Sequence, residues 1–382
     1  MQKLDILIVG AGIAGLTCAG LLKKHGVSPV IIEKEQEDKF NTSGYMLGLF
    51  PLGGRVLTAL DLYDEYRSHS AGMNYYDIYT ARGKRHRTYP LGDLSKKFGP
   101  LRGVKRQELI ELLKSKTENR IRFGITIKSI KQEDKKVNAS FSDNSSAIFD
   151  LVIVADGIHS STRSLLWSKN EYSFYDTNWG GWVEWIDEPS ADRYKECWDA
   201  GSFVGIYPVK DKAGIFLGGP HSINQSKGHK AIAQKLKQRI SPSCEWAHKA
   251  LDQFIETKTG DPFYWEFHDC QTKNWRKGQV ILLGDAACGF LPTAGVGASM
   301  AMDSAVALVD ELSRTDKEHI EYGLHLYISR QKKRVESAQR NSRRLAKLMF
   351  VESKFRARLR DCLLRFYSLD DFIKDIRKIM EG

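Results

Sequence analysis

Residues 4–33 constrain the fold more than any other stretch of this chain. An apolar run over residues 4–9 predicts a buried strand, and helix-forming residues then continue to Lys24. A second apolar run ends at Glu33. Three glycines in G-x-G-x-x-G spacing separate the first strand from the helix: Gly10, Gly12 and Gly15. Strand, glycines, helix and strand together predict a βαβ unit with an open turn after its first strand.

Each glycine in this turn has its own physical role. Gly10 permits the tight turn, Gly12 lets a phosphate approach the backbone, and Gly15 lets helix and strand pack closely. The pyrophosphate of a dinucleotide would meet free N–H groups at the helix N-terminus. Glu33, 18 residues after Gly15, would accept a hydrogen bond from a ribose hydroxyl. With Ala14 of the same turn, these are candidate cofactor-binding residues; the alternative is a glycine-tolerant turn without a ligand.

Composition and charge limit the classes of molecule that this protein could bind. The net charge of +11 suits an anionic cofactor, a nucleic acid or an acidic membrane surface. No basic stripe is interleaved with aromatic residues, so we expect no nucleic-acid binding. The six cysteines form no C-x-x-C pair and no zinc-type cluster, which predicts a reduced compartment and no metal site. The uncharged residues 6–22 are shorter than the roughly 20 residues of a membrane span, so we expect a soluble cytoplasmic protein.

The middle of the chain alternates between two kinds of pattern. Residues 75–90 predict a hairpin that turns at residues 82–84, and residues 106–116 have helical apolar spacing. Short aromatic- and glycine-rich strands dominate residues 173–270, with one inserted helix near residues 228–240. An α/β pattern returns from residue 278, and a basic helical tail occupies residues 318–380.

This order predicts an α/β fold whose Rossmann-like domain is interrupted by insertions. The Rossmann-like domain is expected over residues 1–74, 100–172 and 273–317. A mainly antiparallel sheet domain that forms the substrate region is expected over residues 75–99 and 173–272. A long C-terminal helical segment, residues 318–382, follows.

Two further strands open into glycine and aspartate. Residues 151–163, LVIVADGIHSSTR, contain Asp156 and Gly157, and residues 280–297, VILLGDAACGFLPTAGVG, contain Gly284 and Asp285 ahead of a helix. Strand ends of this kind are where α/β sheets bind ligands. Each segment alone is compatible with a simple turn. Three strand-to-glycine segments in this order indicate a nucleotide cofactor.

These three segments, in this order along the chain, resemble those of the single-component, class A FAD-dependent aromatic monooxygenases of the p-hydroxybenzoate hydroxylase-like superfamily. The resemblance covers residues 4–314, and the C-terminal helix is similar in layout to the tetracycline-inactivating branch. It implies an FAD-binding domain and roles for single residues. Gly10, Gly12 and Gly15 would hold the FAD pyrophosphate, Glu33 the adenosine ribose, and Arg106 would contact FAD.

The resemblance also implies roles in the two later segments. Asp156 and Gly157 belong to a motif linked to both FAD and NAD(P)H, and Gly284 and Asp285 would meet the ribityl chain. Residues 295–298, which include Gly295, Gly297 and Ala298, would face the flavin pyrimidine edge. Pro292 would lie between the flavin ring and the substrate. The family often has a histidine where this chain has Cys288, which weakens any transfer of proton-relay details.

The implied activity is hydroxylation of a small aromatic or polyketide-like substrate with NAD(P)H and O₂, through a flavin C4a-hydroperoxide. Such a site must exclude water, which the aromatic residues of the insertion would achieve. Trp182, Tyr207 and Phe216 are therefore candidate substrate-binding residues; the alternative for each is sheet core, which we favour for any single one of them. No side chain stands out as a general acid or base, so we predict no catalytic side chain.

Several alternatives stay open. The same fold serves flavin-dependent reductases of the geranylgeranyl reductase type and non-catalytic binding modules such as GDP-dissociation inhibitors. Cys288 could be a flavin attachment point, a redox thiol or a small buried residue, of which we favour the last. The apolar stripe of the basic tail could bind a membrane surface or pack on its own protein, and we favour packing. The tail could also guard the substrate entrance.

Overall fold

A six-stranded, mostly parallel sheet forms on the pattern that opens the chain. The computed structural model describes residues 4–42, 44–117, 120–188, 192–257, 262–364 and 366. The predicted βαβ unit is present as β1 (Ile6–Val9), α1 (Ile13–Lys24) and β2 (Val30–Glu33). The strand order is β18-β19-β12-β1-β2-β8. The other four strands are β8 (Ile121–Phe123), β12 (Leu151–Val154), β18 (Arg276–Lys277) and β19 (Val280–Leu282).

This sheet brings the three glycine-containing segments together. β12, β1 and β2 are adjacent and parallel, and β19 is parallel to β12, so the loops after β1, β12 and β19 leave the same edge. Only β18 runs antiparallel. Parallel strands buried on both faces favour continuous apolar sequence, and the side chains of β1 and β12 are fully buried. The predicted α/β fold class is confirmed.

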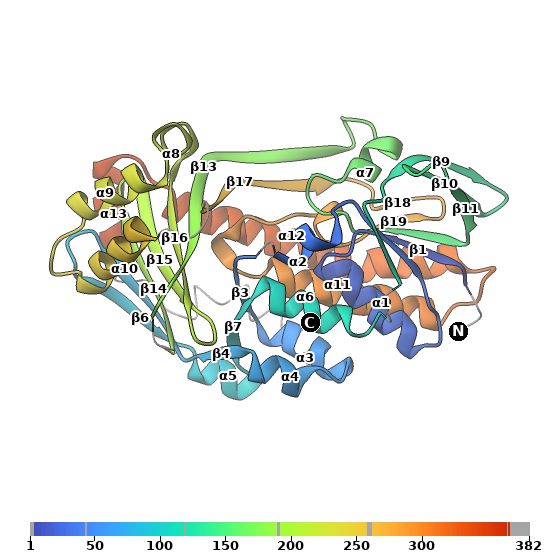
Figure 1. Cartoon of the computed structure of the whole chain (residues 1–382), viewed down its shortest axis with the longest axis horizontal. Helices are drawn as coiled ribbons and strands as arrows, with labels where there is room; N and C mark the ends of the chain where they lie inside the picture. The colour runs from blue at the N-terminus through green and yellow to red at the C-terminus, as the bar shows by residue number, and fades with distance from the viewer. Residues whose placement is uncertain are drawn as a thin grey trace.

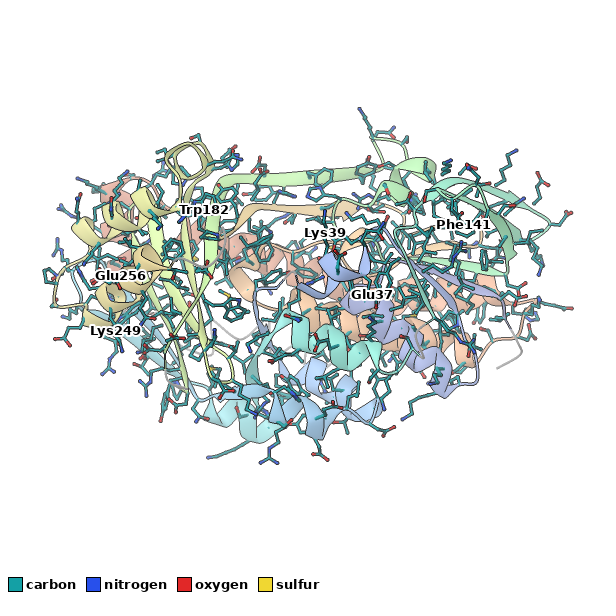
Figure 2. The ribbon with its side chains drawn as sticks, viewed as in Figure 1. Glu37, Lys39, Phe141, Trp182, Lys249 and Glu256 are labelled. Carbon is teal, nitrogen blue, oxygen red and sulfur yellow. The ribbon has the colours of Figure 1, made fainter. Side chains whose placement is uncertain are left out.

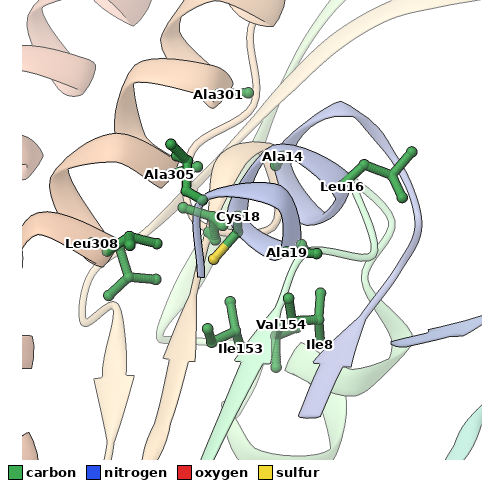
Figure 3. Packing of buried hydrophobic residues seen from close by; sticks show 14 of the residues in the cluster. Ile8, Ala14, Leu16, Cys18, Ala19, Ile153, Val154, Ala301, Ala305 and Leu308 are labelled. Atoms are coloured by element: carbon green, nitrogen blue, oxygen red, sulfur yellow. The ribbon is translucent and has the colours of Figure 1, made fainter. Parts of the chain in front are cut away.

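Small residues allow helices to lie close to this sheet. Figure 3 shows Ala14, Cys18 and Ala19 of α1 among Ile8, Ile153 and Val154 of the sheet, with Ala301, Ala305 and Leu308 of α11 (Gly297–Ser313) beside them. An antiparallel three-stranded sheet packs on the same core. Its strands are β9 (Ile127–Glu133), β10 (Lys136–Phe141) and β11 (Ser146–Phe149).

A seven-stranded sheet occupies the other end of the molecule, as Figure 1 shows. Its order is β17-β13-β16-β15-β14-β5-β6, and all neighbours are antiparallel except β14 and β5. The strands are β5 (Tyr75–Thr80), β6 (Arg85–Pro90), β13 (Tyr172–Ile186), β14 (Arg193–Asp199), β15 (Ser202–Pro208), β16 (Ala213–Pro220) and β17 (Phe263–Thr272). The predicted hairpin over residues 75–90 and the mainly antiparallel sheet are both present. The long strands β13 and β17 run between the two halves (Figure 1).

Three helices cover the outer face of this sheet, where the sequence predicted one. They are α8 (His221–Lys227), α9 (His229–Arg239) and α10 (Glu245–Glu256). The expected helix near residues 228–240 is α9, and the expectation of a single helix was wrong because α8 and α10 were missed. Its buried residues Ala247, Ala250, Leu251 and Phe254 recur at helical spacing and pack on the sheet.

A fourth, small sheet and several short helices complete the fold. The sheet consists of β3 (Met46–Leu49), β7 (Leu101–Lys105) and β4 (Ser70–Met73). The helices are α2 (Glu37–Thr42), α3 (Pro51–Ala59), α4 (Tyr63–Ser68), α5 (Gly92–Phe98), α6 (Arg106–Lys114) and α7 (Ser161–Leu166). The predicted helix from residue 106 is thus confirmed as α6.

The tail forms two helices, α12 (Ile320–Met349) and α13 (Lys354–Leu364), which are separated by a short break. Residue 365 and residues 367–382 of the predicted helical segment lie outside the described residues. The expectation that the apolar stripe packs on its own protein holds for α12, where Met349 is buried and Leu345 and Leu348 are half-buried. It is wrong for α13, because Phe355, Leu359 and Leu363 are 77%, 52% and 57% exposed.

Two absences concern the described part of the chain only. No helix there combines the length and apolar character needed to cross a membrane, and no three side chains of the metal-ligating types cluster together. All six cysteines are described, and none forms a disulfide.

Candidate active site

A cavity of about 390 Å³ lies between the glycine-containing loops and the inner face of the seven-stranded sheet. It brings together residues that are far apart in the sequence. The predicted site residues on its wall are Gly12, Ala14, Arg106, Gly157, Tyr207, Phe216, Asp285, Pro292, Gly295, Gly297 and Ala298. Gly10, Gly15, Glu33, Asp156, Gly284 and Trp182 are not on the wall.

The three glycines after β1 differ in what surrounds them. Gly10 has a φ of +102°, and a Cβ there would lie 2.5 Å from the carbonyl oxygen of Ala155. A Cβ on Gly15 would lie 2.0 Å from the carbonyl oxygen of Gly10. A Cβ on Gly12 would meet nothing within 4 Å. Gly10 and Gly15 therefore allow the turn and the close packing, whereas Gly12 faces open space at the uncapped N-terminus of α1.

The carboxylate of Glu33 stabilises the glycine turn by accepting a backbone hydrogen bond from it. Its Oε2 accepts a hydrogen bond from the backbone N–H of Ala11 at 2.8 Å, and its Oε1 accepts one from the N–H of Glu35 at 3.1 Å. The side chain is 8% exposed. Two further acceptor positions of the carboxylate are left for another donor, such as a ribose hydroxyl.

Asp156 and Gly157 follow β12 on the neighbouring strand. Oδ2 of Asp156 accepts a hydrogen bond from the N–H of Thr162 at 3.2 Å, whereas its buried Oδ1 has no partner. Burial raises the pKa of this carboxyl group. Gly157 has a φ of +85° and open space where a Cβ would lie. An orphaned acceptor beside open backbone is the arrangement expected where a ligand supplies the missing donor.

Asp285, Arg106 and Tyr45 all line the cavity wall, and both charged groups act on the Tyr45 hydroxyl. Solvent reaches Asp285 through the cavity, but the protein that encloses it raises its pKa to about 6 by desolvation. Burial raises the pKa of Tyr45, while the charge of Arg106 and a hydrogen bond from it lower that pKa. The backbone N–H of Arg106 also donates to the carbonyl oxygen of Tyr45 at 2.9 Å. The sequence analysis did not identify Tyr45.

The segment after β19 presents a second uncapped helix. Gly284 and Gly295 have φ values of +61° and +62°. Pro292 begins a short 3-10 turn, η2 (Pro292–Ala294), and α11 then starts at Gly297 with neither a capping side chain nor an acidic residue in its first turn. The N-termini of α1 and α11 thus both reach the cavity wall, and both favour negative charge.

The far wall of the cavity is one face of the seven-stranded sheet. Val183, Phe216, Gly205 and Glu196 pair across four neighbouring strands and therefore point to the same side. Phe203, Trp265 and Phe350 add further rings. Phe350 belongs to the break after α12, so the C-terminal segment contributes to this wall.

Trp182 lies on the opposite face of this sheet. It pairs with Leu217 in the outward-facing row, and its ring contacts Tyr264 at 4.6 Å and His229 of α9 at 5.6 Å between centroids. Figure 2 shows Trp182 at the end of the molecule that also holds Lys249 and Glu256 of α10. Because side chains alternate along a strand, Val183 rather than Trp182 reaches the cavity. The prediction that Trp182 contacts substrate was therefore wrong.

Glu196 is the main residue on this wall that the sequence analysis missed. Its side chain is 7% exposed, and the hydroxyls of Tyr76 and Tyr207 and the indole of Trp198 all donate hydrogen bonds to it. The signal was present in the segment 192–199, where Tyr194, Glu196 and Trp198 alternate with residues of the other face.

Cys288 is 1% exposed and is not on the cavity wall. Burial, together with neighbouring carboxylates, raises the pKa of its thiol well above the ordinary value. A thiol that is buried and protonated is unreactive. This environment supports the interpretation of Cys288 as a small core residue.

Comparison with known proteins identifies the same segments as part of an FAD-binding domain. The family described as "FAD binding domain" matches residues 3–342. A flavin-dependent monooxygenase from Legionella longbeachae is 26% identical over 325 residues, 81% of each chain. Klebsiella pneumoniae HpxO, solved with FAD and uric acid, has the same fold, with a TM-score of 0.86, 22% identity and coverage of 99% of this chain and 97% of that one.

The tetracycline destructase Tet(55) has the same fold at a TM-score of 0.73, with 22% identity and coverage of 99% of this chain and 97% of that one. The family match spans most of the chain and includes every predicted cofactor-binding segment. The protein therefore belongs to the FAD-binding-domain family and is an FAD-dependent monooxygenase of the p-hydroxybenzoate hydroxylase-like superfamily.

Proposed function

We propose that this monooxygenase hydroxylates a small aromatic or polyketide-like substrate within the cavity, with NAD(P)H as reductant and O₂ as oxidant. One observation carries the proposal. The glycine loops with Asp285 and the aromatic face of the seven-stranded sheet enclose the same cavity. A cofactor at the loops and a substrate at the sheet would therefore share one space, which is largely apolar.

The residues at the loop end fit FAD. The open position at Gly12 and the uncapped N-termini of α1 and α11 suit an anionic group, and the orphaned Oδ1 of Asp156 suits a hydroxyl donor. We assign FAD to these residues: Gly10, Gly12, Ala14, Gly15, Glu33, Arg106, Asp156, Gly157, Gly284, Asp285, Gly295, Gly297 and Ala298. Pro292, Tyr207 and Phe216 are assigned to the substrate.

The chain's own residues then bind, orient and exclude water. When bound, FAD supplies hydride acceptance from NAD(P)H and the activation of O₂. Phe203, Phe216, Trp265 and Phe350 surround the rest of the cavity with rings that pack at centroid distances of 5.5–6.4 Å. Keeping water away from an activated oxygen prevents its loss before transfer to the substrate.

The test is a substrate screen with the purified holoenzyme. Aromatic and polyketide compounds are added with NADPH or NADH, and cofactor oxidation, O₂ uptake and product mass are followed together. A true substrate raises cofactor oxidation and O₂ uptake together and gains one oxygen atom. A protein that binds no flavin, or that consumes NAD(P)H without any oxygenated product across the screen, would contradict the proposal.

The reductase alternative separates from this one under anaerobic conditions. A reductase of the geranylgeranyl reductase type would turn over without O₂ and would add hydrogen to a double bond. The monooxygenase would undergo flavin reduction but no product formation until O₂ is admitted.

Location in a reduced compartment such as the cytoplasm stays a prediction.

A further inference from the structure

The cavity contains a carboxyl group that the proposed FAD site does not use. Glu196 lies near the centre of β14, in the cross-strand row that also contains Phe216 and Val183 of the cavity wall. Its neighbour in that row, Gly205, has no side chain. A Cβ on Gly205 would lie 2.6 Å from the hydroxyl of Tyr207, so this glycine makes room for the tyrosine ring to reach Glu196.

Three donors hold this carboxylate in one orientation. Oε2 accepts hydrogen bonds from the hydroxyl of Tyr76 at 2.8 Å and from Nε1 of Trp198 at 2.6 Å, and Oε1 accepts one from the hydroxyl of Tyr207 at 2.7 Å. An indole N–H can only donate, so Oε2 must accept. A carboxylate offers about four acceptor positions, which leaves one, on Oε1, unfilled.

No cation in the described part of the cavity wall balances Glu196. Arg106 is the one basic residue among the described wall residues, and it is bonded to Tyr45 beside Asp285. Arg360 lies 5.6 Å from the ring of Trp198, but its guanidinium bonds to Asp361. Burial raises the pKa of Glu196 and the three hydrogen bonds oppose that rise. A buried acid without an ion pair is costly, and such groups concentrate at functional sites.

A second polar group close to Glu196, the hydroxyl of Tyr194, has no hydrogen-bond partner among the described residues, and a ligand could supply one. Tyr194, two residues earlier on the same face of β14, is 9% exposed and lies on the cavity wall. Its hydroxyl is buried and has no partner. Its ring lies 5.6 Å from that of Tyr207. A substrate at this end would therefore meet one open carboxylate position and one unpaired hydroxyl.

We propose that Glu196 is the substrate anchor of this cavity: it accepts a hydrogen bond from an aromatic O–H or N–H group and excludes substrates that carry a carboxylate. This inference rests on the proposed function. The acid repels a second anion in an apolar space where no wall cation compensates. A donor bonded to a carboxylate also pushes electron density into its ring, which favours attack by an electrophilic oxygen. The substrate class is thus an uncharged or cationic phenol, enol or arylamine.

The experiment measures binding without turnover. Holoenzyme without NAD(P)H is titrated with matched aromatic compounds that differ only in carrying a hydroxyl, amino, methoxy or carboxylate group, and the flavin spectrum reports the dissociation constant. The wild type is expected to bind the hydroxyl and amino compounds roughly tenfold or more tightly than the methoxy compounds. It is expected to bind the carboxylates least. Carboxylates that bind the wild type as tightly as the hydroxyl compounds would overturn the proposal.

Two variants test whether the preference for hydrogen-bond donors depends on Glu196. Glu196→Gln should lose most of the preference for donors and bind carboxylates more tightly than the wild type, with FAD content unchanged. Glu184→Gln is the matched control, because Glu184 pairs with Ile215 in the outward-facing row and does not line the cavity; it should keep the wild-type preference. A folded Glu196→Gln enzyme with an unaltered preference would refute the assignment. If Glu196→Gln does not fold, Glu196→Asp and the wild-type ligand series decide.

The outcome is independent of the proposed reaction. The titration involves neither reductant nor oxygen transfer, so a donor preference that depends on Glu196 supports the anchor even if no hydroxylated product is found. Hydroxylation of carboxylate substrates would leave the proposed function standing and remove the anchor.

Discussion

The two ends of the cavity are built from different parts of the polypeptide. At the loop end the backbone dominates: glycines with positive φ and uncapped helix N-termini leave N–H groups and open space on the wall. At the sheet end side chains dominate, and Tyr76, Glu196 and Tyr207 come from three strands. A backbone site demands glycine at fixed spacing and is visible in sequence. A side-chain site demands only the correct face of each strand.

The largest effect on stability is expected when a methyl group is added at Gly15, and the matched comparison is the same change at Gly12. Gly15→Ala forces a Cβ against the carbonyl oxygen of Gly10, so we expect a loss of about 3 kcal/mol or more in the free energy of unfolding. Gly12→Ala enters open space, so it should leave stability within about 0.5 kcal/mol and weaken FAD binding instead. Thermal unfolding of apoprotein and titration with FAD measure the two effects. Equal destabilisation by both changes would contradict the division of roles.

The next comparison concerns the two faces of the seven-stranded sheet. Trp182→Leu and Phe216→Leu each remove a large, mostly buried ring and should each cost about 2–3 kcal/mol of stability. Only Phe216 lines the cavity, so only Phe216→Leu should change the KM for substrate, by roughly tenfold. Steady-state kinetics of folded variants provide the measurement. A comparable shift in KM for Trp182→Leu would mean that the outer face also serves the reaction.

A smaller effect is expected from Asp285 in the apoprotein. Its folded-state pKa of about 6 lies above its ordinary value of 3.8, so the folded state binds the proton more tightly. Stability therefore falls as the pH rises from about 4 to about 6, and it stays lower above that range. Asp285→Asn should be more stable than wild-type apoprotein at neutral pH, with no difference at about pH 3. Solvent in the cavity keeps the effect small. Urea unfolding across this pH range tests it, and a constant difference at every pH would be inconsistent with titration.

The smallest effect is expected from Cys288→Ser. Because the thiol is buried away from the cavity wall, FAD should be released completely from both the wild type and the variant when the protein is denatured. The flavin in the supernatant after acid precipitation gives the measurement. Flavin that remains with the wild-type polypeptide but not with the variant would show covalent attachment.

Prediction from sequence succeeded where neighbours in the chain are neighbours in the fold. The βαβ unit, the hairpin over residues 75–90 and the helices from residues 106 and 297 follow from local periodicity and glycine spacing. The helices α8 and α10 were missed because they lie within residues 173–270, which were assigned as a whole to short strands with one inserted helix. The break after α12 was missed because the tail was treated as one helical segment. The domain boundaries stay predictions, and the boundary after residue 172 falls at the beginning of the continuous strand β13.

By itself, the sequence determined the loop end of the cavity, because only glycine tolerates a φ of +102° at Gly10 or a 2.0 Å approach at Gly15. Tertiary structure alone decided the sheet end. Whether Trp182 or Val183 faces the cavity depends on the register of β13 with β16, since a shift by one residue exchanges the two faces. The meeting of Glu196 with Tyr76, across 120 residues of chain, likewise arises only when β14 pairs with β5.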